Sequence, residues 1–182
     1  MNKYIGITII TIFVCFTACR KPVNFSDDPS LKVAFSTDTV AFDTVFTSIG
    51  SSTRLLMIYN ENNENVKISS IRLEGGNLSP FSINVDGQSG YEFSDLDIYA
   101  KDSIFVFIRV TINPNDQNNP FFVEDKLLFE TNTNKQVVNL TAYGQNAKYI
   151  IADQYINGFP KFKIVADSLQ VTRWTAERPY VI

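Results

Sequence analysis

Two aspartates that lie two positions apart are the first residues whose types and spacing could do chemistry. Asp95 and Asp97 would share a face if their segment is extended, and paired carboxylates bind Ca²⁺ or divide acid and base roles. A Ca²⁺ site needs about six or more oxygen ligands, however, and a solvated loop before the strand at Ser103 explains the same residues. Turn sequence explains four further polar residues: Asn115, Asp116, Glu124 and Asp125. The sequence therefore predicts no metal site.

The chain contains no histidine, and this excludes histidine-based triads, zinc sites and general bases from its own residues. Its two cysteines, Cys15 and Cys19, both lie near the N-terminus, so thiolate metal clusters are excluded as well. We therefore predict no catalytic residue and no cofactor.

Cys19 is the residue with the most informative surroundings. Lys3 is followed by an apolar run over residues 4–18, and the small residues Thr17 and Ala18 directly precede the cysteine. This arrangement resembles a bacterial lipoprotein signal, which implies cleavage after Ala18 and lipidation of Cys19. A membrane-spanning anchor is an alternative, although the run is shorter than the roughly 20 residues that a spanning helix needs. An ordinary cleaved signal that leaves Cys19 free is the other alternative.

Removal of residues 1–18 leaves 164 residues with 15 basic and 19 acidic side chains, hence a net charge of −4. A mildly acidic chain without basic clusters is a poor ligand for nucleic acid, so we predict no nucleic-acid partner. Because Cys19 is then the one remaining cysteine, no intrachain disulfide can form and stability must come from a core. Residues 19–30 contain two prolines and lack periodicity, which predicts a tether.

The elements that would position any site are strands. Residues 103–112 place Ile104, Val106 and Ile108 on one face and Phe107 and Arg109 on the other. Similar alternation or short apolar runs, separated by Asn- and Gly-rich turns, occur at residues 39–46, 54–59, 66–73, 126–131 and 136–143. The pattern predicts an all-β, immunoglobulin-like antiparallel β-sandwich of about seven strands.

One of these strands changes phase. Val66 and Ile68 share a face, whereas Ile71 and Leu73 would lie on the opposite one. A β-bulge near residues 69–70 would bring both pairs to the core, and a switch between sheets at that point is the alternative.

The order of these segments resembles a known family over residues 38–145. The matching segments are Asn60, Val66-x-Ile68-x-x-Ile71-x-Leu73, Phe81-x-Ile83, Val106-x-Ile108-x-Val110-x-Ile112-x-Pro114, Leu127-x-Phe129-x-Thr131-Asn132 and Val138-x-Leu140-x-Ala142-x-Gly144. They are similar to immunoglobulin-like modules of the abnormal-spindle/hydin type. The resemblance implies a scaffolding or interaction domain without an active site.

The whole chain resembles Bacteroidota surface lipoproteins in which such a module precedes a right-handed parallel β-helix. The resemblance rests on residues 1–19, the module, residues 149–153 and Trp174-x-x-Glu177-Arg178-Pro179-Tyr180-Val181-Ile182. It implies a signal peptide (1–18), a tether (19–30), a sandwich (31–145) and a connector with the first β-helix strand (146–182). We expect the chain to be truncated at Ile182, because an apolar strand ending there would leave an unpaired edge. The alternative is that this strand pairs back onto the sandwich.

Aromatic residues are dense in the last forty positions, and Trp174 is the single tryptophan. Aromatic side chains on a β-surface can stack on sugar rings, which makes Trp174 a candidate glycan contact. Burial in an interdomain seam is the interpretation that we favour.

Four Asp-Ser/Thr-apolar triplets resemble the O-glycosylation acceptor of Bacteroidota. They place candidate acceptors at Thr39, Thr44 and Ser168, and a less suitable one at Ser103 in the head of a predicted core strand. The same dipeptides also mark the starts of ordinary strands.

These observations predict a non-enzymatic lipoprotein of the cell envelope, expected in the outer membrane. Its partners would be the membrane, through the lipid on Cys19, and a cell-surface glycan or protein. Its sandwich would act as a stalk or adaptor. The alternatives are the non-catalytic N-terminal part of a β-helix polysaccharide-active enzyme and a carbohydrate-binding or adhesin module. Because Arg20 and Lys21 directly follow Cys19 and acidic residues come only later, the sequence leaves open whether the protein faces outward.

Overall fold

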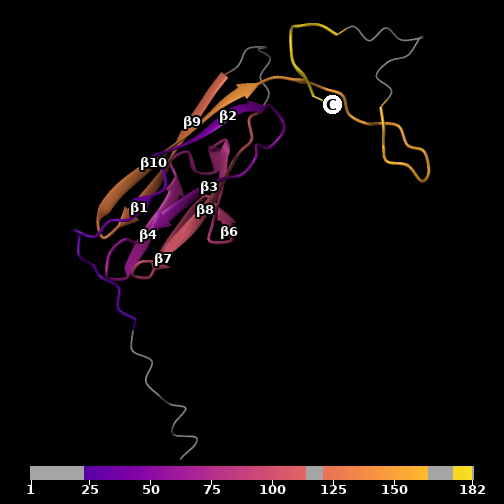
Figure 1. Cartoon of the computed structure of the whole chain (residues 1–182). Coiled ribbons are helices and arrows are strands. Elements are labelled where there is room, and N and C mark those ends of the chain that lie inside the picture. The colour runs from indigo at the N-terminus through magenta and orange to yellow at the C-terminus, as the bar shows by residue number, and fades with distance from the viewer. Residues whose placement is uncertain (1–22, 114–120, 164–173, 182) are drawn as a thin grey trace, which may run out of the picture.

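The structure, a computed structural model, describes residues 23–113, 121–163 and 174–181, and these form two facing β-sheets and a C-terminal extension (Figure 1). Sheet I has the order β1 (Ala34–Phe35), β3 (Arg54–Tyr59), β8 (Ser103–Val110), β5 (Phe81–Val85) and β6 (Gln88–Gly90). Sheet II has the order β2 (Thr39–Phe46), β10 (Asn134–Gln145), β9 (Phe121–Thr131), β4 (Val66–Leu73) and β7 (Glu92–Ile98). The extension carries a two-stranded sheet of β11 (Lys148–Tyr149) and β12 (Tyr180–Val181).

The core lies between the two sheets and is built by the period-two alternation of the strands. In β8, Ile104, Val106 and Ile108 are buried, whereas Phe107 and Arg109 point outward as predicted. The inward residues of β9, β4 and β10 complete one continuous cluster, with Phe129 and Phe81 among its largest fully buried side chains.

This fold confirms the immunoglobulin-like β-sandwich, with two corrections to the prediction. The described part of the sandwich contains ten strands rather than about seven. The three strands that were not predicted, β1, β6 and β7, are short or irregular strands at the sheet edges. It is not wholly antiparallel, since β2 pairs in parallel with β10. The parallel pair arises because the chain leaves sheet I after Phe35 and enters sheet II at Thr39.

The predicted bulge in β4 is confirmed. The register between β4 and β9 shifts between Ile68 and Ser70, and Ser69 is the extra residue. All four apolar residues of the strand are consequently buried: Val66, Ile68, Ile71 and Leu73.

Two buried polar contacts hold the ends of the sandwich. Asn60 directly follows β3. Its side-chain amide nitrogen lies 2.8, 3.1 and 3.0 Å from the carbonyl oxygens of Glu64, Ile98 and Tyr99, respectively. Because Ile98 ends β7, this contact ties sheet I to sheet II. At the opposite end, the Thr47 hydroxyl donates to Oδ1 of Asn146 at 2.9 Å.

Part of the predicted tether lies against the sandwich. Phe25 forms a β-bridge with Asn65, and Ser26 N–H donates to the Asn65 carbonyl oxygen at 2.9 Å. The side-chain amides of Asn132 and Asn134 donate to the carbonyl oxygens of Asp28 and Pro29. The N-terminal segment thus meets one end of the sandwich, and the C-terminal extension leaves from the other (Figure 1).

Among the residues that the structure describes, no helix has the length and apolar character to cross a membrane.

Candidate functional site

The outer face of sheet I is apolar and aromatic. In β3 the outward positions are Leu55, Met57 and Tyr59, and the register places Leu55 opposite Phe107 and Met57 opposite Phe105. The Phe105 and Phe107 ring centroids are 4.9 Å apart. The two strands therefore present a continuous patch of partly exposed apolar side chains, the kind of surface that marks a binding site.

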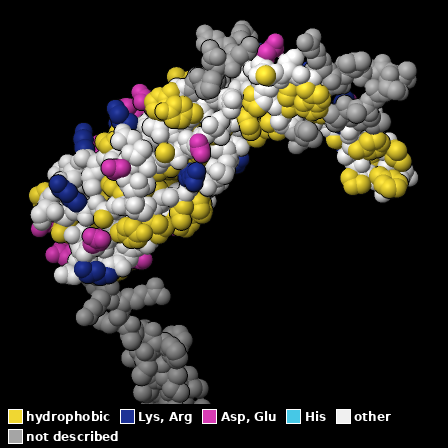
Figure 2. Space-filling model, turned by 45° about the horizontal axis from the view of Figure 1, so that its top comes forward, with side chains coloured by type: hydrophobic (Ala, Val, Ile, Leu, Met, Phe, Trp, Pro, Cys, Tyr) yellow, Lys and Arg dark blue, Asp and Glu magenta, His cyan; other side chains and the backbone are white. Residues whose placement is uncertain are grey.

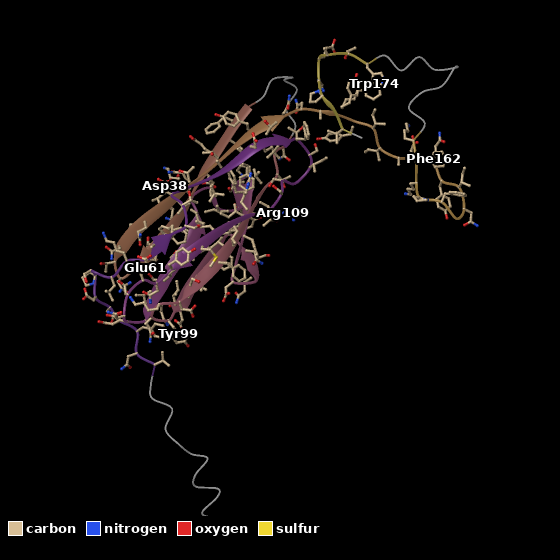
Figure 3. The ribbon with its side chains drawn as sticks, viewed as in Figure 1. Asp38, Glu61, Tyr99, Arg109, Phe162 and Trp174 are labelled. Carbon is tan, nitrogen blue, oxygen red and sulfur yellow. The ribbon has the colours of Figure 1, made fainter. Side chains whose placement is uncertain are left out.

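A hollow of about 650 Å³ adjoins this patch at one end of β8. We call it the Arg109 hollow; its polar and aromatic side chains are Thr53, Ser82, Asn84, Ser89, Tyr91, Phe107 and Arg109. Figure 3 shows Arg109 on the sandwich, away from Tyr99 and Glu61 at the opposite end. The hollow combines two exposed aromatic rings with hydroxyl, amide and guanidinium groups, a mixture typical of ligand pockets.

The Arg109 guanidinium lies close against the backbone of Gly50. A Cβ atom at position 50 would lie 2.8 Å from Nη2 of Arg109, so a glycine gives this side chain its room. Among the described residues, no carboxylate lies within 4.0 Å of the Arg109 guanidinium. Four lysines, in contrast, each form an ion pair with a carboxylate. The positive charge of Arg109 is therefore available to a ligand.

The β5–β6 hairpin fixes the opposite wall of the hollow. Asn84 donates from its amide to the Ser89 hydroxyl at 3.0 Å and accepts from Gly87 N–H at 3.0 Å. Gly87 has a φ of +88°, which favours glycine in this turn. The side chains of Asn84 and Ser89 are thus held in place before any ligand arrives.

The C-terminal extension carries the second group of exposed aromatic residues. The rings of Trp174 and Tyr180 are 4.4 Å apart, and the Lys148 ammonium lies 5.5 Å from the Tyr180 ring centroid. Thr175 N–H donates to the Tyr180 hydroxyl oxygen, and this hydrogen bond lowers the pKa of Tyr180. Trp174 itself is 47% exposed, so the structure leaves its ring accessible to a ligand.

Further apolar side chains lie on the loop between β11 and Lys163. Ile151, Tyr155, Ile156 and Phe159 are exposed, and Ile156 and Phe159 line a shallow hollow together with Phe162. Figure 2 shows apolar side chains gathered on the extension. The hydrogen bond and ion pair between Lys163 and Asp153 brace this loop and lower the pKa of Asp153. Burial of these aromatic residues in a seam would need a surface from outside the described residues and stays a prediction.

The carboxylates that could have formed a site do not converge. Asp95 and Asp97 lie in β7, so the expected loop at this position is wrong, and Asp97 forms an ion pair with Lys67 at 3.4 Å. Glu124 and Asp125 lie in β9, so the expected turn is wrong for these two residues, and Asp125 accepts from Gly75 N–H at 3.1 Å. Asn115 and Asp116 lie outside the described residues. Within the described ranges, no group of three or more Asp, Glu, Cys or His residues could hold a metal ion.

The predicted modification sites fall in different environments. Thr44 is exposed beside Asp43, the extra residue of a bulge in β2, whereas Thr39 and Ser103 are half-buried. Cys19 and Ser168 lie outside the described residues. Lipidation of Cys19 and glycosylation of Thr39, Thr44 and Ser168 stay predictions.

Sequence reasoning missed the Arg109 hollow. The alternation in residues 103–112 placed Phe107 and Arg109 on one face, and this was the available signal. The contributions of Thr53, Ser82 and Ser89 depend on strand pairing across the sheet, which the local pattern does not encode.

No protein-family model matches the chain, and no curated protein matches it. Solved structures of low identity are similar to it. A family 123 glycoside hydrolase from Clostridium perfringens is 10% identical over 65% of this chain and 30% of its own, with a TM-score of 0.44. The ASH/PapD-like domain 7 of human CEP192 is 16% identical over 70% of this chain and 92% of its own, with a TM-score of 0.39.

The periplasmic chaperone SfaE is also similar, with 12% identity over 63% of this chain and 58% of its own and a TM-score of 0.40. This chain thus covers less than two thirds of both the hydrolase and SfaE. At such identities the similarity concerns the immunoglobulin-like β-sandwich alone.

Proposed function

We propose that this chain is a non-enzymatic, lipid-anchored module of the bacterial cell envelope, expected in the outer membrane. In this role the sandwich is an adaptor. It stands between the lipid on Cys19 and a parallel-stranded unit that begins with β11 and β12.

The parallel pair of β11 and β12 carries the adaptor proposal. Lys148 pairs with Tyr180 and Tyr149 with Val181, and Ile150 N–H donates to the Val181 carbonyl oxygen at 2.9 Å. Sheets whose strands are all parallel are almost always covered on both faces, and an isolated two-stranded sheet is marginally stable. We infer that further strands or a partner cover this pair and the exposed aromatic residues beside it.

The placement of the chain ends supports the same role. The described N-terminal segment meets the sandwich near Asn65, and the extension leaves from the far end of β10 (Figure 1). A sandwich with this layout separates whatever anchors its N-terminus from whatever its extension binds.

Cysteine accessibility tests the adaptor role, because a lipidated Cys19 leaves no free thiol in the mature chain. Tyr155→Cys places a thiol on the extension, at a residue that is 66% exposed. We expect maleimide to label it rapidly in the purified chain and slowly in intact envelopes, where its cover is present. Leu78→Cys is the matched control on the sandwich, since Leu78 is 88% exposed and should react in both settings. Equal labelling of Tyr155→Cys in both settings would contradict the adaptor role.

Metabolic labelling with an alkynyl palmitate tests the anchor. We expect label on the wild-type protein and on Cys15→Ser, and neither label nor membrane association for Cys19→Ser. Label that persists in Cys19→Ser would disprove lipidation at this residue.

A glycan-binding role of the extension is the second candidate, and the accessible Trp174 ring favours it. It predicts that Trp174→Ala weakens retention in affinity gels containing a polysaccharide while the melting temperature is unchanged. A lower melting temperature would show that the tryptophan is structural.

A further inference from the structure

We propose that the Arg109 hollow binds a carboxylate-bearing saccharide. In this complex Arg109 receives the carboxylate and Phe107 stacks against a sugar ring. The volume of about 650 Å³ lies within the range of roughly 300–1,000 Å³ that is usual for ligand pockets. All residues that line the hollow belong to the sandwich, so the proposal does not depend on the adaptor role.

Charge identifies the ligand as an anion. The strands β1, β3, β5, β6 and β8 contain no aspartate or glutamate, and their charged residues are Arg54 and Arg109. Arg54 lies 6.0 Å from the centroid of the Phe42 ring, whereas Arg109 lines the hollow without a carboxylate partner among the described residues. A planar guanidinium in this state pairs best with a carboxylate, through two parallel hydrogen bonds.

The polar wall of the hollow suits a ligand with many hydroxyl groups. The hydroxyls of Ser82 and Thr53 have no hydrogen-bond partner among the described residues, and both line the hollow. Ser89 accepts a hydrogen bond from Asn84, which leaves its own hydroxyl hydrogen free to donate. These hydroxyl groups and the Arg109 guanidinium line the same hollow.

The aromatic residues supply the apolar part of the contact. Phe107 is 41% exposed and packs against Phe105, so its ring is held in place and is open on one side. Tyr91 is also exposed at the rim. Sugar rings have apolar C–H faces, and a rigid aromatic ring beside polar groups matches both faces of such a ligand.

Other occupants of this face fit less well. A second copy of the chain packed face to face would bring a second Arg109 and no carboxylate from its own sheet I strands. The centre of a protein–protein interface is usually poor in serine, whereas this hollow collects hydroxyl and amide groups around its one arginine. The observations therefore favour a saccharide over a protein surface.

Calorimetric titration of the purified chain with trigalacturonate tests the proposal. We expect binding of trigalacturonate and no binding of the neutral maltotriose. Arg109→Gln should weaken binding at least about tenfold, because it removes the charge-assisted pair. Phe107→Ala should weaken it about three- to tenfold. Gly50→Ala keeps the charge but displaces the guanidinium, so its effect should be smaller than that of Arg109→Gln.

Two controls separate this site from general attraction of anions. Arg72→Gln, in β4 of sheet II, removes one positive charge elsewhere and should leave trigalacturonate binding unchanged. A triaspartate peptide carries carboxylates without sugar rings and should bind at least about tenfold more weakly than trigalacturonate. Thermal unfolding of each variant confirms that the sandwich is intact.

Three outcomes would overturn the proposal. The first is no trigalacturonate binding in the millimolar range. The second is equal binding by wild type and Arg109→Gln. The third is triaspartate binding as tight as that of trigalacturonate and equally sensitive to Phe107→Ala, which would assign the hollow to an acidic protein segment.

Discussion

The two sheets share one hydrophobic core but differ sharply in charge. The strands of sheet I contain no acidic residue. Those of sheet II contain seven acidic residues: Asp43, Glu92, Asp95, Asp97, Glu124, Asp125 and Glu130. Two ion pairs of sheet II join residues that face each other in register, Lys67 with Asp97 and Lys135 with Glu130.

The difference in charge concerns the outward positions of the two sheets and not the inward positions that form the core. The inward residues of both sheets are equally apolar, so the core requires nothing of the outward positions. On sheet II these positions hold charges of both signs, and two opposite pairs of them form ion pairs. On sheet I they hold aromatic residues and one arginine without a carboxylate partner among the described residues, so this is the face on which we propose a ligand site.

Asn60→Ala tests whether the two sheets unfold as one unit, and it has the largest expected effect. The substitution removes an amide that is 1% exposed and leaves the carbonyl oxygens of Ile98 and Tyr99 without this donor. We expect the free energy of unfolding to fall by about 3 kcal/mol in urea titrations. Asn139→Ala is the control, because Asn139 is exposed and its loss should cost less than about 0.5 kcal/mol.

A loss below about 1 kcal/mol for Asn60→Ala would show that the sheets do not depend on this contact. Separate unfolding transitions for the two sheets would show that they are not one cooperative unit.

A matched pair of aromatic truncations sharpens the contrast between the faces. Phe107 on sheet I and Phe122 on sheet II are 41% and 48% exposed, and each packs against one aromatic neighbour at about 5 Å. Each change to alanine should lower the free energy of unfolding by about 1 kcal/mol, because the lost apolar contact is similar. Only Phe107→Ala should weaken trigalacturonate binding. A similar loss of binding in Phe122→Ala would remove the distinction between the two faces.

Local pattern was sufficient to predict much of the fold. The strands at residues 39–46, 54–59 and 66–73 have the predicted bounds, and the phase slip in the last of these correctly located the bulge at Ser69. Alternation says which residues are buried but not the direction of the neighbouring strand. The parallel pairing of β2 with β10 was therefore beyond local reasoning.

Edge strands were the harder part of the fold. In β7, Asp95 has a φ of +56°, and this kink breaks the alternation of Phe93, Leu96 and Ile98. The segment consequently resembled a loop in sequence.

The candidate site was predictable only in part, for a similar reason. Phe107 and Arg109 follow from the alternation of one strand, but the hollow needs Ser82 and Ser89 from β5 and β6, which reach it through pairing across the sheet. The room for the guanidinium comes from Gly50, a residue 59 positions away in the chain, and no spacing rule connects the two.

A double-mutant cycle on Lys67 and Asp97 probes the charged face, with a smaller expected effect. The pair is 3.4 Å apart and both side chains are about 40% exposed, so solvent screens the interaction. We expect a coupling energy of about 0.2–1 kcal/mol that declines as salt is raised. The cycle cancels the separate contact of Lys67 with the Phe25 ring. The more exposed pair of Lys135 with Glu130 should couple more weakly. A coupling energy between Lys67 and Asp97 that does not change with salt concentration would show that solvent does not screen this pair.

The smallest effect concerns Asp28, where the N-terminal segment meets the sandwich. The Ser30 N–H donates to its carboxylate at 2.8 Å and lowers the pKa of Asp28 below the ordinary 3.8. A carboxyl group whose folded pKa is lowered stabilises the fold above its unfolded pKa, and this contribution is lost as the pH falls through the folded value. Contacts of Asn132 and Asn134 with this segment should therefore loosen only below about pH 3.8. An NMR titration of the Asp28 carboxyl carbon checks this, and a midpoint at or above 3.8 would show that the hydrogen bond to Ser30 does not hold the segment in solution.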